Sequence, residues 1–412
     1  MRKPVIRTVT RGLSAPHPLS SPTIEKAVAE LRAAEAAFSE AGYTVQTVRI
    51  TTRSVFDDMA DATPSELLAY AHRLQGELEN LGIDHFSLGP ALAVRPDFPL
   101  DRLDVIGDLV TENPALTVTA QLASAEHGIR REAALPAART TLQIARNTQA
   151  GIGNFRFAAL FCIEPGHPFF PAGYHAGPDT LSVGLQGAGV LAEAFAEASG
   201  DGGSGSGSNY DRSSSGSSAG IVSPEWITRR TREALTEAAE PVVAIARRLA
   251  EATGVRFGGI DLSPAPTIER SMSIGVAIEA AIGARFGAPG TLAAVGAITR
   301  ALRTTELPIC GYNGLMLPIL EDPVLAEVWE RGELTPHQLL AYSAICGTGL
   351  DTVPLPGTTT AEEIAALYLD VATLAEKLTK PLSARLFPLP GVAAGQRTSF
   401  DSPYLLNIHL PA

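Results

Sequence analysis

The sequence predicts an α/β protein in which roughly ten strands alternate with helices and build one barrel-like sheet with the helices outside. Hydrophobic residues make up 45% of the 412 residues and charged residues only 18%, while glycine (38) and proline (30) are plentiful. This composition is typical of an Ala/Gly/Val-rich α/β enzyme rather than of a β-sandwich. Polar residues gather where the predicted strands end, which favours one barrel-like sheet over two open sheets, and the helical crossovers favour parallel strands.

Apolar, β-branched runs predict the strands, and helical spacing with capping residues predicts the helices between them. Thr63 followed by Pro64 and the threonine-rich run 358–360 are helix-start signals. Strands are predicted over residues 5–10, 44–50, 83–90, 116–122, 153–163, 181–186, 255–266, 307–318, 382–390 and 405–410. Helices are predicted over residues 21–40, 102–110, 135–148, 190–199, 224–253, 273–286, 291–304, 323–332, 336–344 and 359–378, with a further helix beginning at residue 63.

The stretch 342–357 is the one around which the other polar loops are expected to gather. An apolar run leads into a glycine turn that carries a thiol, two threonine hydroxyls and a carboxylate. Pro354 and Pro356 are expected to prevent this turn from continuing as a regular element. A buried strand that ends in such a loop is how α/β enzymes build sites.

Charge and cysteine content exclude several classes of protein. The net charge is -12 and no Lys/Arg cluster forms a basic face, so we expect no nucleic-acid partner. No apolar run approaches a membrane span, no signal-peptide core follows the N-terminus, and three scattered cysteines fit neither a disulfide framework nor a CxxC zinc site. We expect a reduced, soluble, cytoplasmic protein of a single domain, residues 1–412. Residues 200–220, rich in glycine and serine, are expected to be a flexible loop insertion. Exposed Ala-rich helices are compatible with a homo-oligomer.

Cys346 is the leading catalytic candidate. Backbone N–H groups of the flanking glycines could lower its pKa or bind an anion. Cys310 has a similar glycine-rich setting, and the two thiols could face one cavity. The alternative is that Cys346 is a buried cysteine acting as a small apolar residue, which is also the interpretation favoured for Cys162.

Asp261 and Asp351 are candidates for a general base or a metal ligand because each lies beside glycines where a predicted strand ends. An Asx-type hydrogen bond that caps a turn is the alternative for both. His167 and His175 share one loop and are candidates, with Asp261, for binding a divalent metal. Hydrogen-bonded loop histidines are the alternative.

Polar groups at the ends of other predicted strands are suited to hold a carboxylate or phosphate. The candidate substrate-binding residues are Asn154, Arg156, His175, Ser263, Asn313, Gly347, Thr348 and Arg385. For Arg156 and Arg385 a structural ion pair is the alternative. No GxxxxGK[ST] or HExxH motif occurs.

Six blocks spread over nearly the whole chain resemble the domain-of-unknown-function 711 (UPF0210) family. They are Asn154-Phe-Arg-Phe-Ala158, Phe169-Phe-Pro-Ala-Gly-Tyr-His175, Gly258-Gly-Ile-Asp-Leu-Ser263, Gly314-Leu-Met-Leu-Pro318, Cys346-Gly-Thr-Gly-Leu-Asp-Thr352 and Pro381-Leu-Ser-Ala-Arg-Leu-Phe-Pro388. The resemblance implies a ten-stranded β/α barrel similar to that of glycyl-radical enzymes such as pyruvate formate-lyase, with Gly-rich loops at its centre. The tail 400–412 contains no glycine, so glycyl-radical chemistry is not expected.

Two functions remain open at this point. The first is a non-radical enzyme, such as a lyase, hydrolase or transferase, that uses Cys346, Asp261 and Asp351 on a small polar or anionic metabolite at the barrel centre. The second is a non-catalytic regulatory protein that binds a small molecule or metal with the same residues. Whether a bound molecule emerges chemically changed distinguishes the two.

Overall fold

The computed structural model describes residues 3–200 and 223–412, so the predicted Gly/Ser insertion lies almost entirely outside the described residues. The strands are β1 (Val5–Gly12), β2 (Val45–Thr51), β3 (Phe86–Ala91), β4 (Leu116–Ser124), β5 (Gly128–Ile129), β6 (Ala159–Phe161), β7 (Thr180–Gln186), β8 (Arg256–Asp261), β9 (Gly349–Pro356) and β10 (Leu382–Leu389). The α-helices are α1 (Ser21–Glu40), α2 (Val55–Asp58), α3 (Pro64–Leu81), α4 (Asp104–Glu112), α5 (Ala134–Asn147), α6 (Ala188–Gly200), α7 (Pro224–Thr253), α8 (Ile274–Ile282), α9 (Thr291–Arg303), α10 (Pro323–Glu330), α11 (Pro336–Ile345) and α12 (Ala361–Leu378).

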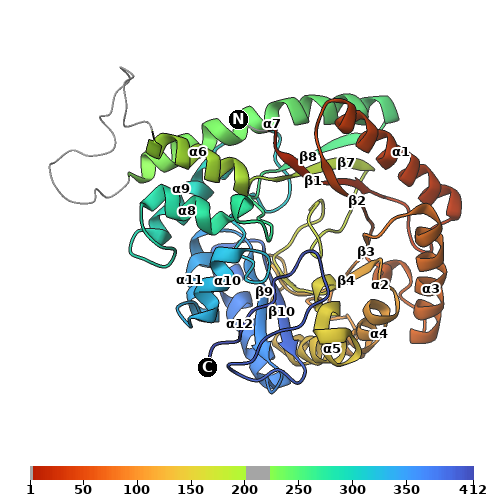
Figure 1. Cartoon of the computed structure of the whole chain (residues 1–412). Coiled ribbons are helices and arrows are strands. Elements are labelled where there is room, and N and C mark those ends of the chain that lie inside the picture. Colours follow the sequence, from red (N-terminus) through yellow and green to blue (C-terminus); the bar gives the residue numbers. More distant parts are fainter. Residues whose placement is uncertain (1–2, 201–222) are drawn as a thin grey trace.

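These strands form one mixed sheet in the order β8-β7-β1-β2-β3-β4-β6-β10-β9, with β5 paired to β4 at the side. The sheet curves around a central region and the helices lie on its outer side (Figure 1). The α/β class is therefore confirmed. Strand pairing among the described residues does not close the sheet on itself, so the barrel stays a prediction, as does the single domain.

The expectation of parallel strands is wrong for three pairs. Strand β7 pairs antiparallel with β1, β10 with β6, and the short β5 with β4. Only a loop separates β6 from β7, whereas the parallel neighbours β1, β2, β3 and β4 are joined through helices. A chain that enters the next strand without a helical crossover is free to reverse its direction.

Local signals predicted the helix starts well. Thr63 and Thr360 each form a capping box, with Glu66 and Glu363 respectively, at the starts of α3 and α12. Both reciprocal pairs satisfy backbone N–H groups that would otherwise lack a partner in the first helical turn. Capping is a local effect, so it can be predicted from neighbouring residues alone.

The stretch 342–357 differs from its prediction. Helix α11 continues to Ile345, Cys346 ends it, and Gly349–Pro356 forms strand β9 despite its two prolines. Strand β9 lies at the end of the sheet and pairs with β10 alone among the named strands, a position that tolerates proline because fewer backbone N–H groups are needed.

Three other predicted strands are shorter or absent. Residues 149–156 form a 3-10 helix, so the strand predicted over 153–163 is reduced to β6. Residues 307–318 and 405–410 form only isolated bridges. In the first of these segments, Ile309 bridges β8 at Ile260 and Pro318 bridges β9 at Asp351.

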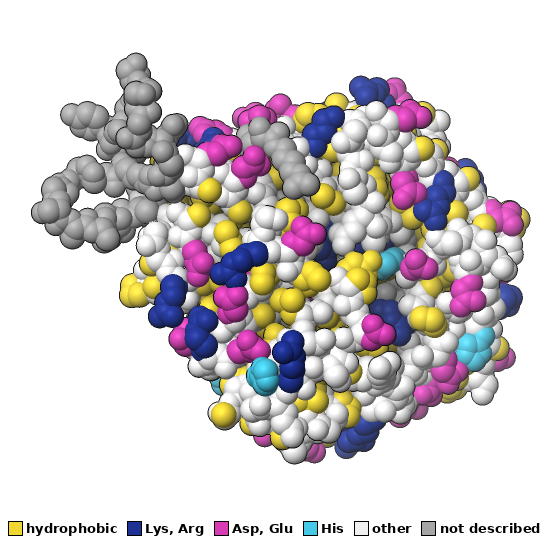
Figure 2. Space-filling view, viewed as in Figure 1, with side chains coloured by type: hydrophobic (Ala, Val, Ile, Leu, Met, Phe, Trp, Pro, Cys, Tyr) yellow, Lys and Arg dark blue, Asp and Glu magenta, His cyan; other side chains and the backbone are white. Residues whose placement is uncertain are grey.

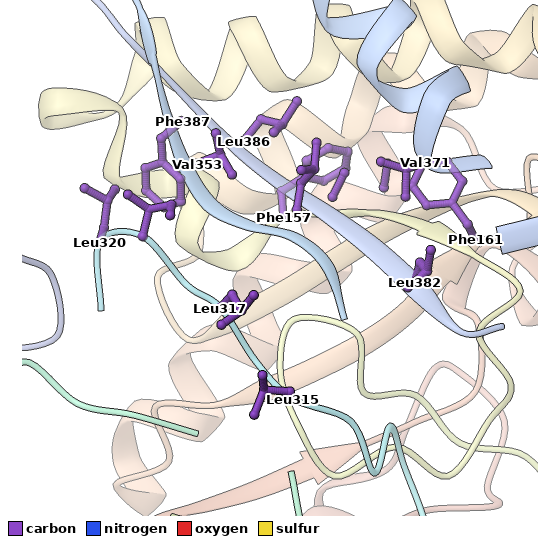
Figure 3. Packing of buried hydrophobic residues seen from close by; sticks show 14 of the residues in the cluster. Phe157, Phe161, Leu315, Leu317, Leu320, Val353, Val371, Leu382, Leu386 and Phe387 are labelled. Atoms are coloured by element: carbon purple, nitrogen blue, oxygen red, sulfur yellow. The ribbon is translucent and has the colours of Figure 1, made fainter. Parts of the chain in front are cut away.

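Helices and the outer face of the sheet enclose the main hydrophobic core. Figure 3 shows part of it, where Val371 of α12 lies beside Phe161 of β6, and Phe157, Leu382 and Phe387 belong to the same cluster. Burying one such side chain stabilises the fold by about 1.5–3 kcal/mol. A second, smaller cluster that includes Phe169, Tyr312 and Met316 lies apart from this core. Acidic and basic side chains are interspersed over the face shown in Figure 2.

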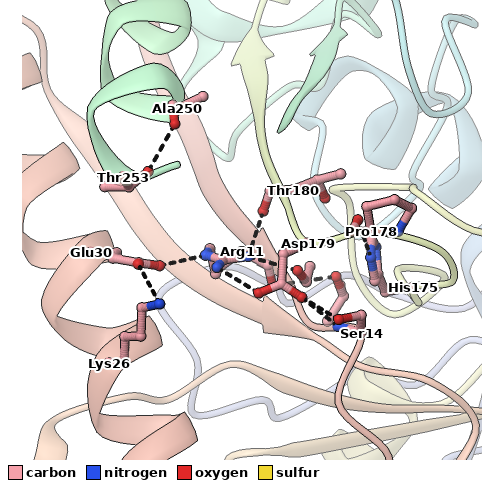
Figure 4. A network of polar contacts seen from close by, with 12 residues as sticks. Arg11, Ser14, Lys26, Glu30, His175, Pro178, Asp179, Thr180, Ala250 and Thr253 are labelled. Carbon is pink, nitrogen blue, oxygen red and sulfur yellow. Dashed lines mark hydrogen bonds and ion pairs between the residues drawn. The ribbon is translucent and has the colours of Figure 1, made fainter. Parts of the chain in front are cut away.

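A polar network at β1 joins the sheet to its surroundings (Figure 4). Arg11 is 2% exposed; its Nε donates to Glu30 of α1 at 2.6 Å and its Nη2 to Asp179, just before β7, at 2.8 Å. Asp179 also accepts a hydrogen bond from Ser14 Oγ at 2.6 Å. Because both carboxylates are paired with one buried guanidinium, the network ties α1 and the start of β7 to β1.

Candidate functional site

A small cavity lies where the sheet meets the loops that follow β6 and β8. Its volume is about 30 Å³, enough for one or two water molecules. We call it the central cavity; it is lined by Arg7, Phe169, Phe170, Pro171, Ala172, Ala265, Pro266, Tyr312, Met316, Pro318, Glu321, Thr348, Asp351, Ser383 and Arg385. A space of about 240 Å³, which we call the outer chamber, shares Arg7, Pro266 and Glu321 with it and is bordered by Tyr404.

Two arginines and two carboxylates form an ionic network along the central cavity. Arg385 Nη2 lies 2.7 Å from Asp351 Oδ1 and also pairs with Glu321. The other oxygen of Glu321 accepts from Arg7 Nη2 at 3.0 Å. Burial raises the pKa of Asp351, and the Arg385 charge opposes that rise. The network therefore places charge of both signs, held by mutual pairing, beside the cavity.

Asp261 is fully buried and joins β8 to the segment 310–314. Its carboxylate accepts hydrogen bonds from Ser263 N at 2.9 Å, Ser263 Oγ at 2.6 Å, Tyr312 N at 2.9 Å and Asn313 N at 3.3 Å. Burial raises its pKa to about 6, and these hydrogen bonds oppose the rise. The bonds to Ser263 are the Asx-type turn that was the alternative for this residue. Asp261 does not line the central cavity but positions Tyr312, which does.

Tyr312 links the two sides of the cavity. Its hydroxyl donates to Ser383 Oγ at 3.0 Å, and Ser383 Oγ donates to the carbonyl of Thr348 at 3.2 Å. The His167 ring packs edge-on against Tyr312 with centroids 4.7 Å apart. Burial lowers the pKa of His167 to about 4, so this imidazole is neutral, and its Nδ1 has no partner among the described residues.

The thiols lie away from the cavity. Cys346 is 1% exposed and belongs to the main hydrophobic core; burial raises its pKa to about 11, and Lys380 opposes this. Cys310 is half-buried, and burial together with Asp261 raises its pKa. Neither Cys310 nor Cys346 lines the central cavity, so the prediction that the two thiols face one cavity receives no support from this cavity. The catalytic role of Cys346 stays a prediction.

Three predicted substrate-binding residues have partners elsewhere. Asn154 Nδ2 donates to the carbonyl of Thr141 at 3.1 Å. Arg156 Nη1 donates to carbonyls near the end of α4, including that of Asn113 at 2.8 Å. His175 Nε2 lies 3.0 Å from the Pro178 carbonyl, as Figure 4 shows. These contacts supply a structural use for part of each side chain, while Asn154 Oδ1 and His175 Nδ1 are buried without a hydrogen-bond partner among the described residues.

The other predicted residues lie at or beside the cavity. Asp351, Thr348 and Arg385 line it. The remaining three hold the loops next to it: Ser263 Oγ accepts from Gly314 N at 3.2 Å, Asn313 Oδ1 accepts from Leu262 N at 3.1 Å, and Gly347 packs against Gly314.

Several cavity residues were missed by the sequence analysis, notably Arg7, Tyr312, Glu321 and Ser383. Arg49, which packs on the cavity residue Phe170 without lining the cavity itself, was missed as well. The available signal was an arginine placed within a β-rich run, as at Arg7 and Arg49. A charged side chain in a buried strand requires a partner or a function.

A metal site receives no geometric support. Among residues 3–200 and 223–412, no three His, Cys, Asp or Glu side chains gather as a metal-binding group. The oxygens of Asp261 are already occupied by four protein donors. The divalent metal proposed for Asp261, His167 and His175 stays a prediction.

The described helices include none long and apolar enough to cross a membrane. The fold and cavity define a mixed α/β protein with a buried, charged site built from distant chain segments.

The chain belongs to the DUF711 family: the model of this family, described as an uncharacterised ACR, matches residues 1–401. A UPF0210 protein from Pyrobaculum arsenaticum is 30% identical over 88% of this chain and 78% of its own length. A UPF0210 protein from Leuconostoc mesenteroides is 26% identical over 96% of this chain and 88% of its own length. The resemblance stated from the six sequence blocks is thereby confirmed as to family.

Proposed function

We propose that this protein is an enzyme that acts on a small polar or anionic metabolite in the central cavity, without glycyl-radical chemistry. The observation that carries the proposal is the Arg7–Glu321–Arg385–Asp351 network, whose members come from β1, β9, β10 and the segment before α10. Ionisable groups that meet in one buried place from distant segments are typical of catalytic sites.

We further propose that the sheet is completed as a barrel of the pyruvate formate-lyase type. The segment 307–320 supports this, since it bridges β8 at one end and β9 at the other, the two ends of the strand order. In such a barrel this segment and the loop after β6 would occupy the interior, as Gly-rich central loops do in the fold that the family resembles.

Within this proposal, Arg7 and Arg385 orient the substrate and Asp351 accepts or returns a proton. Asp351 is the candidate base because its side chain is 15% exposed, lines the cavity and has a pKa raised by burial. Tyr312 is the candidate acid, since its hydroxyl lines the same cavity within hydrogen-bond distance of Ser383. A cavity of about 30 Å³ requires side chains to move before a metabolite fits.

A mass-spectrometric depletion assay tests the proposal. Purified protein is incubated with pooled small polar metabolites, and consumed and newly formed compounds are identified. The wild type and the control Asp97→Asn, whose side chain is 82% exposed, are expected to convert the same compound. Asp351→Asn is expected to bind that compound without converting it. Equal turnover by Asp351→Asn would remove the proposed base, and equal turnover by Cys346→Ala would remove the predicted catalytic thiol.

Non-catalytic binding is the second candidate, and one observation favours it. Both carboxylates of the network are engaged by guanidinium groups, so the site contains no unpaired base. Recovery of a bound small molecule that remains chemically unchanged after prolonged incubation would favour this candidate over the enzyme.

A further inference from the structure

Arg49 on β2 is a buried cation without an anionic partner. The residue is 6% exposed, and its Nε donates to Thr47 Oγ1 at 2.9 Å. Its guanidinium carbon lies 5.1 Å from the centroid of the Phe170 ring, and Phe170 lines the central cavity. No carboxylate of the described residues forms an ion pair with Arg49, although Arg7, Arg11 and Arg385 all have such pairs. A buried guanidinium paired only with a hydroxyl and a ring face is costly to maintain.

The charges around Arg49 leave an excess of one positive charge. The groups that act on it electrostatically include Arg7, Arg385 and Glu321, and Asp351 pairs with Arg385. Together with Arg49 itself, this set contains three positively charged guanidinium groups and two negatively charged carboxylates. Burial and Arg7 lower the pKa of Arg49 to about 9, so it still carries its charge at neutral pH.

His85 lies in the same region and does not change this balance. Its ring is 6.3 Å from that of Phe170, centroid to centroid. Burial, Arg49, Arg7 and Arg156 lower the pKa of His85 to about 3, so the imidazole is neutral. The excess positive charge therefore has no protein counterion among the described residues, and a ligand is the remaining source of one.

We infer that the substrate of the central site carries a carboxylate of single negative charge, and that Arg49 binds this group with Arg7 beside it. This inference rests on the proposed function and names its substrate class. One carboxylate balances the excess charge, whereas a phosphate group would bring nearly two negative charges. The guanidinium fork matches the two oxygens of a carboxylate, and Phe170 offers an apolar face next to it.

Acetate is the probe, with acetamide as its neutral counterpart of the same shape and methyl phosphate, whose second pKa is about 6, as a dianion above neutral pH. Binding is followed on the full-length protein by the rise in thermal unfolding midpoint with ligand concentration. Acetate is expected to raise the midpoint of the wild type, acetamide is not, and methyl phosphate is expected to bind more weakly than acetate. Equal stabilisation by acetamide and acetate would overturn the inference without any variant being needed.

Arg49→Met locates the binding. This variant is expected to weaken acetate binding about tenfold or more, while its midpoint without ligand stays equal to or above that of the wild type, because an unpaired buried charge is gone. Arg49→Lys keeps the charge but not the fork and is expected to fall between the two. The control is Arg331→Met, because Arg331 and its partner Glu333 are both exposed. If the dissociation constant of acetate for Arg49→Met were within about twofold of the wild-type value, the inference would be overturned.

The two proposals fail separately. If Arg49→Met leaves acetate binding unchanged while Asp351→Asn abolishes turnover, the proposed anion site is wrong and the proposed enzymatic function is supported. If acetate binding depends on Arg49 but no compound is converted, the anion site is supported and the proposed enzymatic function is wrong.

Discussion

Gly314 and Gly347 pack backbone against backbone, so closely that a Cβ atom on Gly347 would lie 2.7 Å from the Cα of Gly314. The contact joins the segment between α9 and α10 to the turn before β9, and the two are far apart in the sequence. It lies next to Thr348 of the central cavity. The glycines of the 346–349 turn are therefore required for close packing, whatever role its thiol has.

Gly347→Ala is expected to lower the free energy of unfolding by about 1–3 kcal/mol, because the added methyl group meets backbone that cannot move aside easily. Chemical denaturation measures the change. The control is Gly76→Ala in α3, where a Cβ would have no neighbour within 4 Å. That variant should gain about 0.5–1 kcal/mol from helix propensity. Equal stability of the two variants would contradict the packing argument.

Asp261→Asn is expected to lower the free energy of unfolding by about 2–4 kcal/mol. The carboxylate accepts four hydrogen bonds, and the NH2 group of asparagine would place a donor against some of these donors. Asp97→Asn, at an exposed position, should change stability by less than about 0.5 kcal/mol. Denaturation midpoints of the two variants provide the check. A stable Asp261→Asn protein that has lost turnover would instead assign Asp261 a direct chemical role.

Arg385→Met is expected to destabilise the protein by about 3–5 kcal/mol, because Asp351 has no other ion-pair partner among the described residues. Adding Asp351→Asn should recover at least about 1 kcal/mol of that loss, since the uncompensated carboxylate is removed. A double-mutant cycle by urea denaturation measures this coupling. Purely additive losses would show that the two side chains do not stabilise one another.

The three thiols are expected to react slowly with a disulfide reagent near neutral pH. Burial raises the pKa of Cys162 and of Cys346 to about 11, and it also raises that of Cys310. Because the thiolate is the reactive species, modification of the native protein should accelerate with rising pH, and unfolded protein should react much faster. One rapidly modified thiol in native protein, lost in Cys346→Ala, would restore Cys346 as an activated nucleophile.

Stability is expected to fall as the pH drops below the ordinary histidine range. His17 is buried between Tyr70 and Thr52, and burial lowers its pKa from 6.5 to about 4. The unfolded chain therefore takes up this proton first, so the contribution is complete above about pH 6.5 and is lost as the pH falls toward 4. The loss from His17 should reach about 2 kcal/mol near pH 5. Thermal unfolding of wild type and His17→Gln across this range is the test, and parallel curves would contradict it.

Much of the fold could be predicted where the signals are local. The capping residues Thr63 and Thr360 marked real helix starts, and alternating apolar runs marked β1, β2 and β4. Such features depend on residues a few positions apart. The glycines and prolines of 346–356 predicted an irregular turn, but residues 349–356 form strand β9. Whether a strand tolerates proline depends on which neighbouring strands it pairs with, and a local sequence pattern does not contain that information.

The candidate site was predictable only in part. Asp351, Thr348 and Arg385 were proposed from their positions near strand ends, and they do line the central cavity. Arg49 and Glu321 were missed because nothing near them in the sequence reveals their partners. Asn154 and Arg156 were proposed from the strand-end pattern, yet their side chains donate to the backbone carbonyls of Thr141 and Asn113.

The sequence by itself determined the α/β class, the family and the positions of most helices, since composition, capping and the six blocks that resemble the family are properties of the chain as written. Only the tertiary structure decided that β7 runs antiparallel to β1 and β10 to β6, that Cys346 lies in the core, and that Arg49 has no carboxylate partner among the described residues. Burial and charge pairing arise between residues that are distant along the chain. Their energies are therefore set by packing, which no local pattern of residues specifies.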